Sequence, residues 1–413
     1  MPIVKTMESD RHDIVVLGGG LVGMAMAVAL SRYGMSVVLI DPAPVADRGS
    51  IDFDGRAYAV APGSRNLLTA IGVWDAVKPQ AQPISRIQVA DRTEGPCPPG
   101  GLHFDPDEIG VQTLGWIVED HVLRRALLDA VSAGDVVHLA PARAVSVVRD
   151  AYCALVALED GRRIQTAMVV ACDGRRSATA QAAGVEYVSW GYSQTGLVSA
   201  VAHTAPHHGL AHQGFYSGGP FAVLPMTGDR SALVWSEHAA EAERISALSD
   251  AEYLQAVASR IGGRLGALEL VGKRWAYPLG LALATRYALP RMVVAGDAAH
   301  GVHPIAGQGM NLGLRDVAAL TEVLVEAQRL GLDIGTKDVL EGYERWRRFD
   351  GTALSLGIDG LNRLFSTSFG PLQAARSVGL ELVDRLPGAR RAFMNAASGV
   401  GDGAPALLRG HAI

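Results

Sequence analysis

The pattern of apolar and polar positions near the N-terminus predicts alternating strands and helices. Residues 13–17 and 36–40 are short, nearly continuous apolar runs, which are typical of central parallel strands buried on both faces. Between them, residues 21–33 are mostly small or apolar and are followed by Gly34, so we expect a helix that stops at this glycine. The three segments together predict a βαβ unit with a right-handed crossover.

The pattern changes near residue 187. Over 187–284, short runs of alternating polarity such as 219–226 predict antiparallel strands, and one helix is expected near 249–261. Residues 291–295 return to the apolar pattern of a buried parallel strand, and a long helix is predicted from about 310 to 331. An antiparallel unit therefore interrupts the α/β unit.

The remaining segments extend these two units. We expect a helix over 117–131 and a buried strand over 167–172 in the α/β unit, and only helices over 336–400. The prediction is an α/β fold in which a Rossmann-like domain is interrupted by an α+β antiparallel-sheet domain and followed by C-terminal helices. The Rossmann-like domain is assigned 1–78, 111–186 and 285–335, the antiparallel domain 187–284 with an excursion over 79–110, and the C-terminal helical region 336–413.

Composition excludes several classes of protein. The 413 residues are 49% hydrophobic and 19% charged, which is typical of a globular protein with two or three domains. A net charge of −5 without a run of Lys and Arg argues against a nucleic-acid partner. Three distant cysteines without a Cys-x-x-Cys pair argue against a disulfide framework or an iron–sulfur site, and we expect a cytoplasmic protein.

Residues 14–30 carry no charge, so a signal peptide or a short membrane span is an alternative for this stretch. Its glycines favour another interpretation. Gly18-x-Gly20-x-x-Gly23 follows a strand and opens a helix, and Asp41 ends the next strand. These glycines allow a tight turn, close approach of a pyrophosphate and close helix–strand packing, and the acidic residue would hydrogen-bond a ribose. The pattern predicts a bound dinucleotide and leaves NAD and FAD open.

A second cluster, AGDAAHGVHPIAGQGMNLGLRD at residues 295–316, favours FAD. Asp297 follows a strand end, where a carboxylate can accept a hydrogen bond from a ribityl chain, a polyol that FAD has and NAD lacks. The Gly-Gln-Gly turn opens a helix whose N-terminus would stabilise negative charge on a reduced isoalloxazine. The residues that we expect at the flavin are Asp297, Gly307, Gly309, Met310 and Asn311. The Rossmann-like domain is therefore predicted to bind FAD.

Several phrases of the sequence resemble one family nearly from end to end. They are DIVVLGGGLVGMAMAVAL, GRAYAV around Arg56, GPFAVLPM, GDAAH, HPIAGQGMNLGLRD, LNRLFS and GLELVDRLPGARR. With these motifs the chain resembles the ubiquinone-biosynthesis aromatic-ring hydroxylases, a branch of the para-hydroxybenzoate-hydroxylase-like FAD monooxygenases. The resemblance implies that NAD(P)H reduces FAD, that a flavin C4a-hydroperoxide forms, and that the ring of a polyprenylated phenol is hydroxylated. No second Gly-x-Gly-x-x-Gly unit follows in a strand–helix context, so no separate NAD(P)H domain is expected, and the resemblance implies that NAD(P)H binds only transiently.

The resemblance also implies roles for individual residues. The cofactor-binding residues would be Gly18, Gly20 and Gly23 at the pyrophosphate, Asp41 at the adenosine ribose, Arg56 near the phosphates, Asp297 at the ribityl chain, Gly307, Gly309, Met310 and Asn311 at the flavin, and Asp120, Val145 and Asp173 around them. Pro304 would line the flavin face where oxygen reacts, and His303 is the candidate for a catalytic polar group that faces the ring. The alternative for His303 is a loop histidine with a backbone partner.

Two positions depart from the family's pattern. The family's middle Asp-Gly fingerprint continues to an Arg, whereas Ala180 stands at that position, and Arg175 or Arg176 are the candidates to replace it. Asp120 stands where relatives carry Arg, Gln or Asn toward the cofactor. Because an acid beside a pyrophosphate is unfavourable, we expect Asp120 to bind the cofactor differently or to point away from it.

Further partners follow from the resemblance. The substrate would be a polyprenylated aromatic compound, whose tail suggests that the apolar face of 354–365 or of 372–386 touches a membrane or a ubiquinone-biosynthesis complex. The alternative is that these helices pack onto the protein's own core. A peripheral position at the inner membrane and a homo-oligomer are left open. The histidines between 203 and 212 look like part of an exposed hairpin without a ligand scaffold, so we expect no metal.

Two other functions are left open by the sequence. One is a hydroxylase of a soluble aromatic metabolite, and the other is a flavin-bound, non-catalytic member of a biosynthetic complex. An NAD-dependent dehydrogenase is disfavoured because residues 295–316 would then have no task.

Overall fold

The structure is a computed structural model that describes residues 11–49, 52–91, 101–366, 386–401 and 403–413. The strands of its first sheet are β1 (Arg11–Leu17), β2 (Val37–Ile40), β8 (Val136–Leu139), β9 (Ala144–Arg149), β10 (Ala154–Leu158), β11 (Arg163–Ala171), β17 (Ala288–Leu289) and β18 (Met292–Val294). The order is β17-β18-β11-β1-β2-β8, and β9 and β10 extend β11 as an antiparallel hairpin. β1 pairs in parallel with both β2 and β11, as its continuous apolar run predicts.

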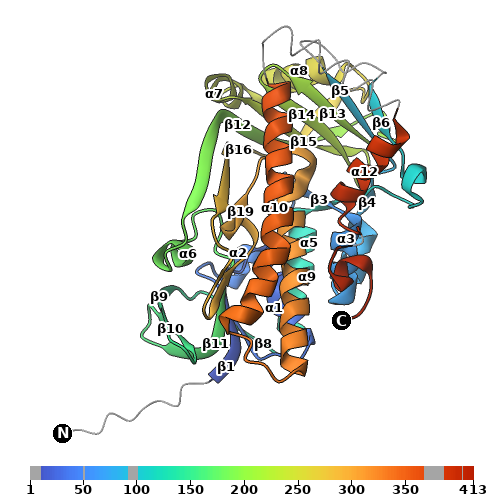
Figure 1. The fold of residues 1–413 in the computed structure, drawn as a ribbon. Coiled ribbons are helices and arrows are strands. Elements are labelled where there is room, and N and C mark those ends of the chain that lie inside the picture. Colours follow the sequence, from blue (N-terminus) through green and yellow to red (C-terminus); the bar gives the residue numbers. More distant parts are fainter. Residues whose placement is uncertain (1–10, 50–51, 92–100, 367–385, 402) are drawn as a thin grey trace, which may run out of the picture.

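Long helices pack beside this sheet. They are α1 (Leu21–Arg32), α5 (Asp120–Ala133), α9 (Gln308–Arg329) and α10 (Lys337–Phe365). α1 contacts α5 and α9, and α10 packs along α9. Figure 1 shows α10 running lengthwise from the first sheet to the second, so this helix braces both parts of the molecule.

The predicted helix over 117–131 is wrong at its start. Trp116–Glu119 forms strand β7, and the helix begins only at Asp120 as α5. β7 pairs antiparallel with β3 (Ala57–Val60). This tertiary pairing suits the β-branched Ile117 and Val118 better than a helix does.

The second sheet is built mainly from antiparallel strands. They are β5 (Arg86–Asp91), β6 (Leu102–Phe104), β12 (Tyr187–His203), β13 (Leu210–Tyr216), β14 (Gly219–Met226), β15 (Arg230–His238), β16 (Leu268–Ala284) and β19 (His300–Gly301), in the order β19-β16-β12-β15-β14-β13-β5-β6. The segment 79–110 contributes β5 and β6, and β5 pairs with β13. The limits of the two domains stay a prediction, whereas the α/β fold with an antiparallel sheet and C-terminal helices is confirmed.

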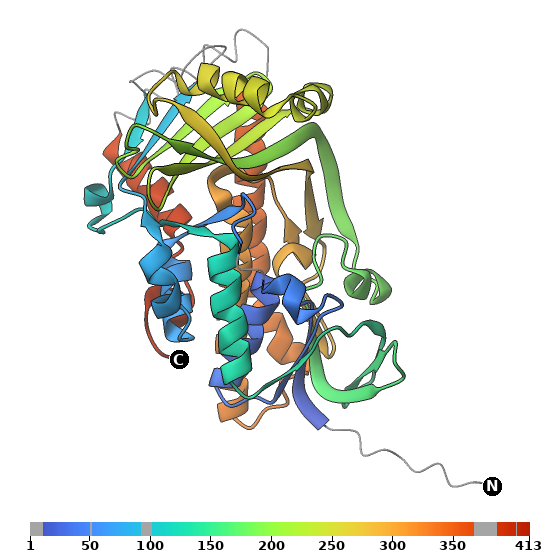
Figure 2. The ribbon, with the colours of Figure 1, turned by 180° about the vertical axis from the view of Figure 1, so that it is seen from behind.

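Two helices cover the outer face of the second sheet. α7 (Ala239–Ser246) contributes Ile245, and α8 (Asp250–Ile261) contributes Tyr253 and Val257, to a core that includes Leu233 of β15. Figure 2 shows them above the strands, on the side away from the first sheet. The inner face of the second sheet is therefore left to face the first part of the molecule.

Shorter elements complete the fold. They are β4 (Gln82–Pro83), which joins β3 and β7 in a three-stranded sheet, and the helices α2 (Val45–Arg48), α3 (Pro62–Ala70), α4 (Trp74–Val77), α6 (Ala178–Ala182) and α12 (Pro387–Ser398). Within the described part of the chain, no helix combines the length and the hydropathy that crossing a bilayer requires. Residues 372–385 of the second predicted apolar face lie outside the described residues.

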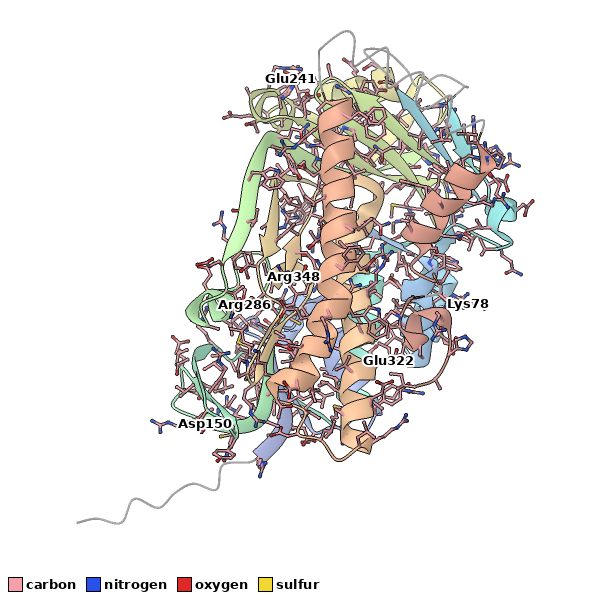
Figure 3. All side chains as sticks on the ribbon, viewed as in Figure 1. Lys78, Asp150, Glu241, Arg286, Glu322 and Arg348 are labelled. Atoms are coloured by element: carbon pink, nitrogen blue, oxygen red, sulfur yellow. The ribbon has the colours of Figure 1, made fainter. Side chains whose placement is uncertain are left out.

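Burial follows the apolar pattern of the sequence. Residues 14–16 of β1 are fully buried. Many charged side chains lie at the periphery, as Figure 3 shows for Asp150, Glu241 and Arg348, whereas a few, such as Asp316 and Arg347, are buried.

Candidate active site

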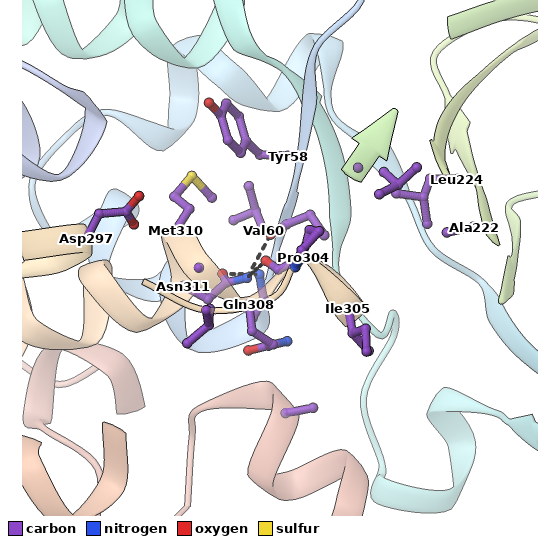
Figure 4. Close-up of a pocket in the computed structure, with 18 of the residues that line it drawn as sticks. Tyr58, Val60, Ala222, Leu224, Asp297, Pro304, Ile305, Gln308, Met310 and Asn311 are labelled. Atoms are coloured by element: carbon purple, nitrogen blue, oxygen red, sulfur yellow. Dashed lines mark hydrogen bonds between the residues drawn. The ribbon is translucent and has the colours of Figure 1, made fainter. Parts of the chain in front are cut away.

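A cavity of about 1320 Å³ is lined by residues from both parts of the molecule. Gly20 and Gly23 at the start of α1 line it on the side of the first sheet, and Ala222 and Leu224 of β14 line it on the side of the second. Figure 4 shows these two sides facing each other, with Asp297 opposite β14. The two glycine clusters of the sequence therefore open onto one space.

The first glycine cluster forms the turn between β1 and α1. Gly18 has a φ of +106°, and a Cβ atom there would lie 2.4 Å from the carbonyl oxygen of Cys172. A Cβ atom on Gly23 would lie 1.9 Å from the carbonyl oxygen of Gly18, so neither position accepts a side chain. Gly20 instead has open space beside it and lines the cavity. The turn thus brings backbone and the free amides of the first turn of α1 directly to the cavity.

The second glycine cluster forms the start of α9. Gly307 precedes the helix with a φ of +60°, and a Cβ atom there would lie 3.0 Å from the Cβ atom of Ala59. Gly309 and Met310 follow in the first helical turn and line the cavity. The amides of this turn have no acceptor within the helix, so they are available to a ligand. A helix N-terminus of this kind favours negative charge.

Asn311 holds this helix start against β3. Its Oδ1 accepts hydrogen bonds from the backbone N–H of Ala61 (2.9 Å) and the hydroxyl of Ser64 (2.7 Å). Its Nδ2 donates to the carbonyl oxygens of Ala59 and Gly307, at 2.8 and 3.0 Å, as drawn in Figure 4. The side-chain amide of Asn311 is therefore hydrogen-bonded within the protein, and only its other atoms are left for the predicted flavin contact.

Asp297 lies in a short 3-10 turn, Gly296–Ala298, and points into the cavity (Figure 4). Its carboxylate is half exposed and lies 3.7 Å from the Nε of Arg175. The turn is anchored from behind, because the N–H of Gly296 donates to Oδ2 of Asp316 at 2.8 Å. The carboxylate of Asp316 therefore holds the turn that carries Asp297, the predicted ribityl contact, at the cavity.

Asp316 joins three elements through charged groups. Burial alone would raise the pKa of Asp316, but His300 and Arg347 outweigh it and hold the pKa below its usual range. His300 Nε2 lies 2.6 Å from Oδ2, and Arg347 Nε donates to Oδ1 at 2.7 Å. All three side chains are at most 2% exposed. The network ties the Asp297 turn to α9 and α10.

Asp41 contacts the cavity only through the side chain of Arg48. It is 1% exposed, and its carboxylate accepts hydrogen bonds from the N–H of Ala43 (2.7 Å) and from Nη2 of Arg48 (3.1 Å). Arg48 lines the cavity, whereas Asp41 does not. The predicted ribose contact stays a prediction, and Arg48 is an additional polar group at that end.

Asp120 is not among the residues that line the cavity, and its predicted role at the cofactor stays a prediction. Its carboxylate accepts hydrogen bonds from Arg124, at 2.7 and 3.1 Å, and lies 3.4 Å from Nη2 of Arg56. Both arginines line the cavity, and Asp54 holds Arg56 from the other side at 2.6 Å. Burial alone would lower the pKa of Arg56, but Asp54 and Asp120 raise it above its usual value. Asp120 is therefore a positioning residue for two cations.

Two further predicted residues do not line the cavity. Val145 on β9 is 58% exposed. Asp173 accepts a hydrogen bond from the N–H of Thr179 at 3.2 Å. Ala180 is fully buried in α6, while Arg175 and Arg176 line the cavity, so both candidates to replace the family's Arg are placed there.

His303 and Pro304 separate in the structure. Pro304 lines the cavity, but His303 is fully buried beneath it and accepts a hydrogen bond from the N–H of Ile305 on Nδ1 (3.3 Å). Burial lowers the pKa of His303 to about 4, and the charge of Arg175 adds to the effect. The alternative of a loop histidine with a backbone partner matches this geometry. A neutral imidazole turned away from the cavity has no direct access to a substrate ring.

These features fit FAD. Two helix N-termini, after Gly20 and Gly307, face one elongated cavity, where amides would meet the pyrophosphate and the reduced ring. The Asp297 carboxylate lines the same cavity and can accept a hydrogen bond from a polyol, and Gly20 leaves the open space that a phosphate needs. A nicotinamide dinucleotide would leave the second helix start without a charge to stabilise.

Comparison with known proteins agrees. The family model described as FAD binding domain matches residues 11–354. Ubiquinone hydroxylase UbiL of Rhodospirillum rubrum is 42% identical over 411 residues, which cover 98% of this chain and 94% of that protein. The 3-demethoxyubiquinol 3-hydroxylase of Escherichia coli is 32% identical over 400 residues, covering 95% and 100%. The chain belongs to the ubiquinone-biosynthesis branch of the FAD-dependent hydroxylases.

Solved structures show the same fold. The crystal structure of p-nitrophenol 4-monooxygenase PnpA from Pseudomonas putida superposes with a TM-score of 0.76 at 17% identity, covering 94% of this chain and 98% of that one. The predictions of FAD as cofactor and of an FAD-dependent aromatic-ring monooxygenase with NAD(P)H as electron donor are confirmed.

Some residues of the site were missed in the sequence. Arg124 follows Asp120 by one helical turn on a helix that was predicted, so the i, i+4 spacing was an available signal for their pairing. Arg48 was also missed, because no regular helical spacing relates it to Asp41. Arg56 was predicted at the phosphates, but no local pattern connects it with Asp120.

Proposed function

We propose that this protein hydroxylates the aromatic ring of a polyprenylated phenol in ubiquinone biosynthesis. The observation that carries the proposal is the apolar extension of the cavity. Beyond the flavin end, its lining residues include Ile87, Val89, Leu102, Phe104, Ile109, Phe215, Leu361, Phe365, Phe393 and Met394. A small aromatic acid would leave most of this surface in contact with water, whereas an isoprenoid tail would cover it.

Phe393 of α12 both lines the cavity and is partly exposed to solvent. Phe104 and Phe393 stack with ring centroids 5.5 Å apart, and Phe393 is 48% exposed. Leu386 at the start of α12 is also 48% exposed. We infer that the tail leaves the cavity here and that this end of the molecule contacts the membrane as a peripheral surface.

Within this function the chain supplies positioning rather than a catalytic base. Bound FAD supplies the activation of oxygen after reduction by NAD(P)H. The amides at the start of α9 would stabilise the charge of the reduced ring, and Pro304 and Ile305 would keep water from the reacting face. His303 stays neutral at physiological pH because its pKa is about 4, so it holds the loop through Ile305.

Purified protein loaded with FAD tests the proposal directly. NAD(P)H oxidation and product mass are measured with a prenylated phenol that carries a short tail and with the same phenol without the tail. We expect hydroxylated product from the prenylated phenol and a much higher KM without the tail. Efficient turnover of the tail-less phenol would favour a hydroxylase of soluble metabolites. Failure to oxidise NAD(P)H with either compound, with FAD bound, would favour a non-catalytic member of a complex.

A matched pair of variants tests the exit at α12. Phe393→Ala removes the ring that stacks on Phe104, and Phe349→Ala removes an aromatic side chain that is 80% exposed on α10. The first is expected to raise KM for the prenylated phenol and to leave KM for the tail-less phenol unchanged. Equal effects of the two substitutions would contradict an exit at α12.

A further inference from the structure

The wall that the second sheet gives to the cavity carries no Asp, Glu, Lys or Arg among the described lining residues. Side chains at directly opposed positions of neighbouring strands point to the same face of a sheet. One row of such positions crosses β12, β15, β14, β13, β5 and β6 and consists of Val198, Val234, Ala222, Gln213, Val89 and Leu102. Gln213 is the polar member of this otherwise apolar row.

The side chain of Gln213 has no hydrogen-bond partner within the described part of the chain, and it is only partly buried where it lines the cavity. Its amide offers two donors and one acceptor. A ligand that fills the cavity removes water from this amide. An apolar ligand would therefore leave it unpaired at a free-energy cost, whereas an oxygen on the ligand would satisfy it.

The polar residues of this wall nearest to Gln213 on β13 and on β15 are less suited to the same task. Ser236 is 1% exposed, and its hydroxyl, which has no partner among the described residues, is covered by protein. His212 pairs with Val223, whose side chain belongs to the core under α8, so its imidazole lies on the other face of the sheet. Gln213 is long enough to reach into the cavity and lies on the correct face.

Gln213 also lies opposite the loop of the predicted flavin site. Its strand partner Ala222 is shown in Figure 4 across the cavity from Pro304. Its neighbours Phe215, two residues along β13, and Val89, its partner on β5, pack in one cluster with Ile305. A ring bound between the two sides would have the Pro304 loop on one side and the amide of Gln213 on the other.

We propose that Gln213 is the residue that determines ring orientation, by hydrogen-bonding the oxygen of an uncharged phenol or quinol in an apolar pocket. This inference rests on the proposed function and adds that the ring group bound by Gln213 is uncharged. A neutral amide on an uncharged wall selects a hydroxyl, because it gives a carboxylate no counter-ion. Gln213 thereby fixes which ring carbon faces the cofactor.

Equilibrium dialysis with the FAD-loaded protein tests this without relying on turnover. The two probes are 2-farnesylphenol and farnesylbenzene, which share the tail and differ by the ring hydroxyl. Native protein is expected to bind the phenol about tenfold more tightly than farnesylbenzene. This ratio corresponds to the free energy of one hydrogen bond to a group that is otherwise unpaired. Gln213→Leu should bind both probes alike, with affinity for farnesylbenzene equal to or above that of native protein. Gln213→Met, of similar length, should do the same and replaces it if the Leu variant does not retain FAD.

Ser236→Ala is the matched control, since it removes a hydroxyl from the same wall, and it should keep the preference for the phenol to within about twofold. A preference for the phenol that survives in both Gln213 variants would overturn this inference and leave the proposed function intact. A native protein that binds neither probe would instead overturn the proposed substrate class, and the role of Gln213 with it.

Discussion

Replacing Asp316 by Asn tests the buried network behind the Asp297 turn. The carboxylate meets Arg347 at 2.7 Å, His300 at 2.6 Å and the N–H of Gly296 at 2.8 Å. Asn keeps the shape but removes the charge, which leaves the Arg347 guanidinium buried with Asp350 as its remaining anion. Breaking one side of a buried ion pair costs about 3–5 kcal/mol, and the retained partner places the expected loss near the lower limit, about 3 kcal/mol.

Urea unfolding of the FAD-free protein measures this loss, and FAD titration measures the effect on the turn. We expect Asp316→Asn to lower the free energy of unfolding by about 3 kcal/mol and also to weaken FAD binding, because the turn that carries Asp297 loses its anchor. Asp129→Asn is the control, since it breaks an exposed helical pair with Arg125 that contributes at most about 0.5 kcal/mol. A loss below about 1 kcal/mol with unchanged FAD affinity would refute the reasoning.

Three further predictions follow from single contacts. Gly23→Ala should yield protein without bound FAD, because the new Cβ would lie 1.9 Å from a backbone oxygen, and visible absorption measures the bound cofactor. Gly357→Ala, with open space around it, should retain FAD. Burial raises the pKa of the Cys172 thiol, so mass spectrometry should show that iodoacetamide labels Cys153 before Cys172; the opposite order would contradict the raised pKa of Cys172. Burial lowers the pKa of His303 to about 4, so the unfolded chain, with its histidine pKa near 6.5, binds more protons between these pH values. Stability should therefore fall as pH drops from about 6.5 to about 4, by about 3 kcal/mol from this residue, and His303→Gln should flatten that part of the pH profile.

The elements that the sequence predicted well are those whose pattern is local. The apolar run of β1 and the glycines at 18 and 23 each meet a requirement of the backbone itself, so spacing alone located them. Strand β7 was missed because its conformation is decided by pairing with β3, almost sixty residues earlier in the chain. A local pattern carries no information about such a partner.

Side-chain roles were harder to predict for the same reason. His303 looked suited to catalysis beside Pro304, yet the direction of the loop buries it. The position of Gln213 in the cavity wall depends on strand register across the second sheet, which no motif encodes. Family resemblance supplied positions at the cofactor, and only the fold showed which side chains face it.

The arginines around the cavity change how cofactor binding should respond to salt. Arg48 pairs with Asp41, Arg56 and Arg124 share Asp120, and Arg56 also has Asp54. Arg175 lies near Asp297 in the same way. Because these carboxylates cancel most of the side-chain charge, attraction for the pyrophosphate must come mainly from the amides at the two helix starts, which act over short distances.

Charge interactions between exposed groups weaken as the ionic strength rises, because the Debye length shortens, whereas hydrogen bonds from fixed amides change little. We therefore expect the dissociation constant of FAD, measured by fluorescence titration, to rise less than about threefold between about 50 and about 500 mM NaCl. Asp120→Asn uncovers a net positive charge beside the cavity and should make binding more sensitive to salt than in the native protein. A native protein whose FAD affinity falls tenfold or more over this range would contradict the charge balance and would indicate that the arginines, rather than the helix starts, hold the phosphates.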